Sequence, residues 1–161
     1  MFLLFCFCLQ NLEWQDVIAA GRIERPVLLT HCGDNRRFIV EQRGRIWILQ
    51  QGILQAAPFL DIRDQVFFEN ERGLLSLAFS PDFSQSGYFF ITYVRASDQS
   101  SVLARVQVAK DAKIADPSSQ EMLMILPQPS PHQFTAISPK SGRPLCSPSG
   151  RIIEPFASLC C

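Results

Sequence analysis

The sequence carries no excess of charge of either sign. Lysine and arginine together number 15, aspartate and glutamate also number 15, and the formal net charge is zero. A neutral chain gives no electrostatic case for nucleic acid or for an anionic membrane surface as a partner. Long apolar runs are missing as well. The apolar run at residues 2–9 is far too short to cross a bilayer, so we expect no membrane span.

Metal-binding and common catalytic motifs are also absent. The six cysteines include no Cys-x-x-Cys pair, and no histidine follows at zinc-ligand spacing. His31 stands beside Cys32 without a further ligand at fixed spacing, so we interpret it as an ordinary loop histidine. No glycine-rich phosphate loop, Gly-x-Ser-x-Gly or His-Glu-x-x-His occurs. We therefore expect free thiols and no metal site.

The chain does contain much proline, glycine and phenylalanine, with 11, 8 and 13 residues. This composition in a short chain favours turns and β-structure over a helical bundle. At 161 residues and 47% hydrophobic content, the chain is large enough for one domain with a real core. Residues 1–11 form an apolar leader, which is either the core of a secretory signal or a disordered tail.

The first half of the chain predicts an antiparallel meander. Four segments have strand character: residues 14–20, 26–30, 37–42 and 45–50. The last two flank Arg43-Gly44, and a two-residue connection that contains glycine predicts a hairpin. Because strand side chains alternate, Phe38 and Val40 would share one face, and Ile39 and Glu41 the other.

The second half continues in the same way. Its predicted strands are residues 74–79, 88–94, 102–108 and 122–126. Residues 102–108 alternate between apolar and polar positions, as in a half-buried antiparallel strand. Pro81 presets a turn after the first of these strands, and residues 115–119 are predicted to form another turn. The pattern as a whole predicts an all-β fold.

A charged loop, Asn70-Glu71-Arg72-Gly73, directly precedes the predicted strand at 74–79. We expect Gly73 to end the loop because glycine tolerates a positive φ. The buried strand fixes the loop at its end, and sheet proteins usually carry function in such loops. Glu71 and Arg72 are therefore candidate functional residues.

The run from Glu71 to Phe83, ERGLLSLAFSPDF, resembles the glucose/sorbosone dehydrogenase family, the soluble aldose sugar dehydrogenases. Other segments that follow the family pattern are residues 25–27, 33–34, 38–46 and 58–62. The resemblance implies a six-bladed β-propeller, of which residues 12–133 would form about the first two antiparallel blades. It also implies pyrroloquinoline quinone (PQQ) and calcium as cofactors of the family. Hedgehog-interacting-protein-like domains share the fold and this run.

The resemblance further implies site residues. His132 stands where PQQ-dependent sugar dehydrogenases carry the general base, which takes the proton of the sugar's C1 hydroxyl as hydride passes to the quinone. Imidazole suits this task because its pKa lies near the working pH. The alternative is a solvent-exposed histidine in a proline-rich segment. Glu71 matches a polar residue near the family's active site, which would place Glu71 and Arg72 close to substrate or cofactor. The alternative is a solvated carboxylate beside an arginine paired with Glu69 or Glu71.

Residues 134–161 depart from the family pattern. Proline, serine and glycine recur there without a strand or helix period, which predicts an irregular tail. In the family, the cofactor-binding arginines and lysines and the calcium ligands come from later blades. The chain is therefore interpreted as a truncated member of a family of oxidoreductases that act on the C1 hydroxyl of an aldose. It would bind neither PQQ nor calcium and would be inactive alone.

Two other interpretations stay open. One is a propeller-type protein-binding module of the Hedgehog-interacting-protein-like kind, with a protein partner in place of a sugar. The other is a non-functional product of truncation or of a shifted reading frame. Members of the family are usually periplasmic or secreted, so the resemblance implies that localisation for this chain.

Overall fold

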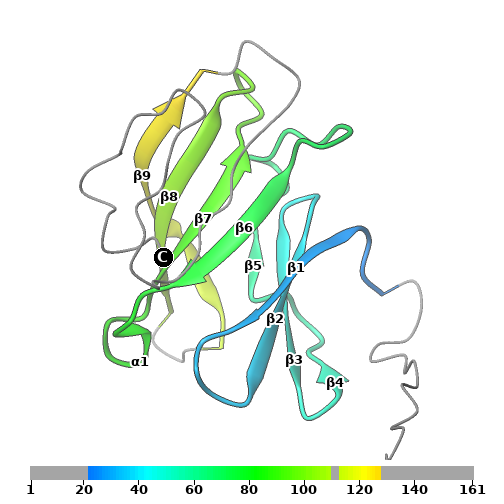
Figure 1. Ribbon diagram of the computed structural model, residues 1–161, viewed down its shortest axis with the longest axis vertical. Helices are drawn as coiled ribbons and strands as arrows, with labels where there is room; N and C mark the ends of the chain where they lie inside the picture. The colour runs from blue at the N-terminus through cyan, green and yellow to red at the C-terminus, as the bar shows by residue number, and fades with distance from the viewer. Residues whose placement is uncertain (1–21, 110–112, 128–161) are drawn as a thin grey trace, which may run out of the picture.

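The computed structural model describes residues 22–109 and 113–127, which form two antiparallel β-sheets and one short helix. The first sheet has the order β1-β2-β3-β4, and β5 also pairs with β3. Its strands are β1 (Pro26–His31), β2 (Arg36–Glu41), β3 (Arg45–Gln50), β4 (Ile53–Leu54) and β5 (Leu60–Asp61). The second sheet runs in chain order through β6 (Leu74–Phe79), β7 (Tyr88–Val94), β8 (Ser101–Val108) and β9 (Ala115–Leu126). The all-β prediction is confirmed, and Figure 1 shows the two sheets with β6 beside β1.

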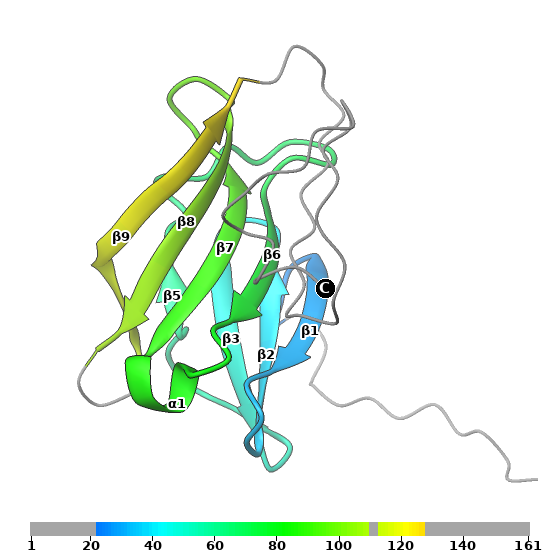
Figure 2. The same ribbon diagram turned by 60° about the vertical axis from the view of Figure 1, so that its left-hand side comes forward.

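The main core lies between the two sheets. Phe38 and Val40 of β2 face Phe79 of β6 and Phe89 of β7 in one continuous apolar cluster. The ring centroids of Phe38 and Phe79 are 4.6 Å apart, so aromatic contacts join the two sheets directly. Figure 2 shows the short helix α1 (Phe83–Ser86) at the end of the second sheet, between β6 and β7. Its Phe83 ring packs on Phe79 at 4.6 Å and closes this end of the core.

The alternation predicted for the β2–β3 hairpin is confirmed. Phe38 and Val40 belong to the main core, whereas Ile39 lies on the other face of the first sheet. Together with Ile39, a second apolar cluster on that outer face contains Trp47, Leu49 and Leu54. Glu41 also points to this outer face and is fully buried. The first sheet therefore packs its main apolar cluster on one face and buries a carboxylate on the other.

The connection between β2 and β3 differs from the expected two-residue turn. Glu41 pairs with Arg45, so three residues, beginning with Gln42, form the connection. The backbone N–H of Gly44 donates to the carbonyl of Glu41 at 3.0 Å, and Gly44 has a φ of +112°. Gln42 therefore leaves the ladder, and its side chain is available for contacts with the second sheet.

The predicted turn at residues 115–119 is wrong, because this segment is the first part of β9. Local turn chemistry is present: the Asp116 carboxylate accepts the backbone N–H of Ser118 at 2.9 Å. The β8–β9 pairing nevertheless continues past it, with a register shift between Arg105 and Gln107. The Ser119 hydroxyl accepts the N–H of Gln107 at 2.9 Å and so bridges the irregular part of the ladder. Pairing with β8 thus overrides the local preference for a turn.

Several predictions lie outside the described residues. These are the apolar leader, the strand at 14–20, the base His132 and the irregular tail at 134–161. Over the ranges that are described, no helix is long and apolar enough to cross a membrane.

Candidate functional site

Glu71 sits at the tip of a tight turn that leads into β6. The N–H of Arg72 donates to the carbonyl of Glu69 at 2.8 Å, and the N–H of Glu69 donates back to the carbonyl of Arg72 at 3.3 Å. Asn70, the first central residue of the turn, has a φ of +52°. Asparagine tolerates this left-handed conformation better than most residues. The turn exposes the Glu71 side chain, as the sequence pattern predicted for a loop carboxylate.

Gln42, in the β2–β3 connection of the first sheet, holds this turn through hydrogen bonds to its backbone. Its side-chain Nε2 donates to the carbonyl of Asn70 at 2.7 Å and to the carbonyl of Arg72 at 3.2 Å. Its own backbone carbonyl accepts the N–H of Leu74 at 2.8 Å. The side chain is 6% exposed, so these bonds form away from water and are costly to lose. The Glu71 turn is therefore attached to both sheets.

Gly73 has a different role from the one expected. Its φ is not among the positive values; Asn70 carries the left-handed conformation of this loop. A Cβ on Gly73 would lie 2.3 Å from the carbonyl oxygen of Gln42 and 2.6 Å from its Cγ. Glycine is required here because the two backbones approach closely, not because of the turn.

Arg72 is largely enclosed rather than presented to solvent. Its side chain is 14% exposed and forms an ion pair with Glu69. Its guanidinium donates to Oε1 of Gln99 at 2.6 Å and lies 4.6 Å above the ring of Phe67. The Nε atom is buried without a hydrogen-bond partner. Of the two pairings expected, the structure shows the one with Glu69. Arg72 thus braces the turn against the β7–β8 connection.

That connection is itself held by a salt bridge. The Arg95 guanidinium bonds both carboxylate oxygens of Asp98, at 2.9 Å and 2.5 Å. These hydrogen bonds hold the pKa of Asp98 well below its ordinary value. Asp98 also accepts the N–H of Ser100 at 3.2 Å, and Gln99, between them, has a φ of +58°. The partner of Arg72 therefore stands on a fixed turn.

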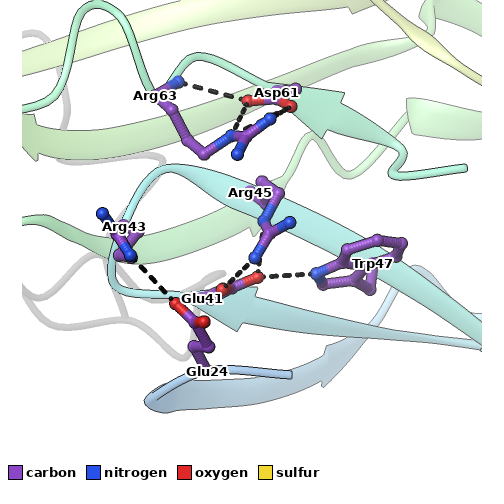
Figure 3. A network of polar contacts seen from close by, with 7 residues as sticks. All are labelled: Glu24, Glu41, Arg43, Arg45, Trp47, Asp61 and Arg63. Atoms are coloured by element: carbon purple, nitrogen blue, oxygen red, sulfur yellow. Dashed lines mark hydrogen bonds and ion pairs between the residues drawn. The ribbon is translucent and has the colours of Figure 1, made fainter. Parts of the chain in front are cut away.

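Two arginines lie over the ring of Phe68, which directly precedes the Glu69–Arg72 turn. The guanidinium carbons of Arg25 and Arg43 each lie 5.3 Å from the centroid of the Phe68 ring. Arg43 also pairs with Glu24 at 3.1 Å, as Figure 3 shows. Both arginines belong to the first part of the chain, so these cation–π contacts link Phe68 to the first sheet.

Figure 3 also shows the buried carboxylate of Glu41. Glu41 accepts two hydrogen bonds from Arg45, at 2.8 Å and 2.6 Å, and one from the indole N–H of Trp47 at 2.8 Å. Both residues that donate to Glu41 lie on β3, so this network lies within one hairpin. This network stiffens the strand from which Gln42 emerges.

The sequence-predicted site residues are only partly placed. Glu71 and Arg72 lie together in one turn, but His132 lies outside the described residues. His31 lies at the far end of β2 from this turn. Sequence reasoning missed Gln42, Phe68 and Arg25. Only the Glu41-Gln42 pair before Arg43-Gly44 gave a signal, and it was interpreted as the end of a strand.

The residues that the structure describes do not fit the cofactors that the resemblance implies. Within those ranges, no group of three histidine, cysteine, aspartate or glutamate side chains could hold a metal ion. Arg72, the cation nearest Glu71 in sequence, is already engaged by Glu69 and Gln99. We therefore derive no chemical step through calcium or PQQ from these two sheets.

Comparison with known proteins gives a consistent result. The human Hedgehog-interacting protein is 37% identical over 95 residues, which cover 55% of this chain and 13% of that protein. The PQQ-bound aldose sugar dehydrogenase of Streptomyces coelicolor superposes with a TM-score of 0.60 at 16% identity, over 72% of this chain and 35% of that one. The soluble aldose sugar dehydrogenase of Escherichia coli, in its apo form, gives a TM-score of 0.54 at 20% identity, over 64% and 30%.

These structural matches show the fold: the two antiparallel sheets correspond to propeller blades of the glucose dehydrogenase type. The chain spans only about a third or less of the length of the proteins that it matches. The family model for glucose/sorbosone dehydrogenases matches residues 23–135, which is well over half of the chain. The chain therefore belongs to the glucose/sorbosone dehydrogenase family.

Proposed function

We propose that this chain supplies one wall of the sugar site of a PQQ-dependent aldose dehydrogenase, and that Glu71 is its contact to the ligand. One observation carries the proposal: the Glu71 turn is exposed at its tip yet is tied to both sheets through Gln42. A carboxylate held in this way accepts hydrogen bonds from sugar hydroxyls with little loss of conformational entropy.

Glu71 and Arg72 have separate roles in this proposal. Arg72 is enclosed by Glu69, Gln99 and Phe67, so it positions the turn and does not meet the ligand. Glu71 reaches the ligand. His132 is the proposed general base for the proton of the C1 hydroxyl, by its place in the family pattern.

The chain alone is proposed to be inactive. Oxidation of a sugar needs a hydride acceptor, and most of that chemistry belongs to the cofactor. The described sheets offer binding groups and no calcium cluster. Residues 12–133 are proposed to form the propeller part, in line with the family match at residues 23–135. The chain is proposed to be periplasmic or secreted, as members of that family usually are.

The proposal is tested on the purified chain by ¹H–¹⁵N NMR titration with D-glucose, alongside a dye-reduction assay with PQQ and calcium. We expect weak, saturable shifts at the amides of residues 70–73, lost in Glu71→Ala, and no dye reduction. Glu71→Gln is the matched variant, because an amide oxygen still accepts hydrogen bonds. Absence of shifts at this turn would contradict the wall proposal. Dye reduction that is lost on His132→Ala would contradict the proposed inactivity.

A second candidate function is a protein-binding module. It is supported by the 37% identity to the human Hedgehog-interacting protein, whose name states its partner. In this case the same propeller surface would recognise a protein in place of a sugar. Surface plasmon resonance with a Hedgehog protein, run beside PQQ and calcium titrations, separates the two. Binding of the protein without any PQQ response favours the module.

A further inference from the structure

A pocket of about 380 Å³ opens where β1 turns into β2. Its lining consists of Leu29, Thr30, His31, Asp34, Asn35 and Arg37. The full length of β2 separates it from the Glu71 turn, because Gln42 follows the other end of that strand. Neither the proposed sugar site nor the main core uses these side chains.

Two hydrogen-bond donors stand side by side in this pocket. His31 and Arg37 are direct cross-strand partners, so their side chains project from the same face of the sheet. The N–H of Gly33 donates to Nδ1 of His31 at 3.2 Å, so the neutral imidazole carries its proton on Nε2. Among the residues that the structure describes, the Arg37 side chain has no hydrogen bond or ion pair. Both the Nε2–H group and the guanidinium are therefore available to a ligand.

The one acidic side chain in the lining does not neutralise Arg37. The Asp34 carboxylate accepts hydrogen bonds from the backbone N–H and Nε of Arg36, each at 2.8 Å. Burial alone would raise the pKa of Asp34, but the hydrogen bonds from Arg36 outweigh it and hold the pKa below its ordinary value. Asp34 and Arg36 thus form a closed, neutral pair, and Arg37 remains as the net positive charge of the pocket.

An apolar surface lies beside these donors. Leu29 pairs with Ile39, two residues along each strand from His31 and Arg37, and its side chain is 60% exposed. A bare oxyanion would leave most of the pocket empty and this leucine uncovered. A carbon chain attached to the anion would cover it.

We propose that this pocket binds a small organic anion. Its carboxylate or phosphate group pairs with the Arg37 guanidinium and accepts the Nε2–H of His31, and its carbon chain packs on Leu29. The planar guanidinium matches the two oxygens of such a group in a bidentate pair. This site is independent of the proposed sugar site.

The test is an NMR titration of the full chain that follows the Nε–Hε signal of Arg37 and the imidazole of His31. The probes are acetate, hexanoate, inorganic phosphate and hexanol. We expect saturable shifts of both side chains with hexanoate, weaker ones with acetate, and none with hexanol. A stronger response to phosphate than to acetate assigns the pocket to phosphate esters, and the reverse assigns it to carboxylates. The proposal is overturned if no anion gives a saturable shift up to about 50 mM, because a dissociation constant above that concentration is too weak for a specific site.

Variants locate the binding. Arg37→Gln removes the charge and is expected to weaken hexanoate binding about tenfold or more. Arg63→Gln is the matched control, since Arg63 is exposed, lies on the β5 side of the sheet and already pairs with Asp61. It should leave binding unchanged. Equal loss in both variants, or no loss in Arg37→Gln, overturns the proposal. Should Arg37→Gln fail to fold, Arg37→Lys takes its place beside the shifts in the unaltered chain. Lysine keeps the charge but not the bidentate geometry, so hexanoate should bind Arg37→Lys more weakly than the unaltered chain.

Discussion

The backbone of Gly73 lies so close to Gln42 that a Cβ on this glycine would stand 2.3 Å from the Gln42 carbonyl oxygen. The same carbonyl accepts the N–H of Leu74 at 2.8 Å, at the first residue of β6. The hairpin of one sheet and the entry strand of the next are therefore joined by backbone contact. The exposed Glu71 turn stands directly on this junction.

Gly73→Ala should destabilise the chain by about 2–3 kcal/mol, because the new methyl group forces the Gln42 and Leu74 backbones apart. Urea denaturation followed by far-UV circular dichroism measures this loss. The control is Gly52→Ala, where nothing lies within 4 Å and only the φ of +77° opposes a side chain. That control should cost about 1 kcal/mol. An equal loss of unfolding free energy at the two positions would show that the Gln42 backbone leaves room for a side chain at residue 73.

Gln42→Glu should be more harmful than Gln42→Met. Methionine removes the donor but fills similar space, at a cost of about 2 kcal/mol. Glutamate places an ionised acceptor opposite the carbonyl oxygens of Asn70 and Arg72, which repel it. Once protonated, that carboxyl can donate again. The difference in free energy of unfolding between Gln42→Glu and Gln42→Met should therefore become smaller as the pH falls. Hydrogen exchange at the amides of residues 70–74 should quicken in both, and an unchanged rate would contradict the role of Gln42.

The strands of this fold were predictable because their side chains alternate between polar and apolar positions. Phe38 and Val40 on one face and Ile39 on the other follow from period two alone. The turn at residues 115–119 was predicted wrongly because Asp116 and Pro117 have turn chemistry, whereas pairing with β8 decides the outcome. The local sequence of a segment does not indicate which other strand it will pair with in the folded sheet.

The candidate site was predictable only where it is local. Glu71 and Arg72 are adjacent in sequence, so their shared turn followed from the loop pattern. The contact from Gln42 to Asn70 joins residues 28 positions apart, and no periodicity reports such a contact. For the same reason Gly73 was assigned to a turn, although its real constraint is the Gln42 backbone. His132 as the general base stays a prediction.

Glu41→Ala should cost about 3 kcal/mol, because it leaves the Arg45 guanidinium and the buried indole N–H of Trp47 without their acceptor. Glu41→Gln keeps an oxygen that accepts one of these hydrogen bonds and should cost clearly less. Urea denaturation of both variants gives the comparison. If both variants lost the same free energy of unfolding, the hydrogen bonds would be irrelevant and only the charge would matter.

Stability should fall as acid is added, and Asp98 should contribute to that fall. The Arg95 hydrogen bonds place the folded-state pKa of Asp98 below its ordinary value of 3.8, which stands for the unfolded chain. The unfolded state therefore takes up this proton first. The stabilisation is complete above pH 3.8 and is lost as the pH drops further.

Asp98→Asn removes this contribution, so its melting temperature should lie below that of the unaltered chain at pH 6 and approach it towards pH 3. Asp64→Asn, at an exposed position without an ion pair among the described residues, is the control and should leave the profile unchanged. Parallel profiles for Asp98→Asn and the unaltered chain would mean that Arg95 holds the turn without help from this carboxylate.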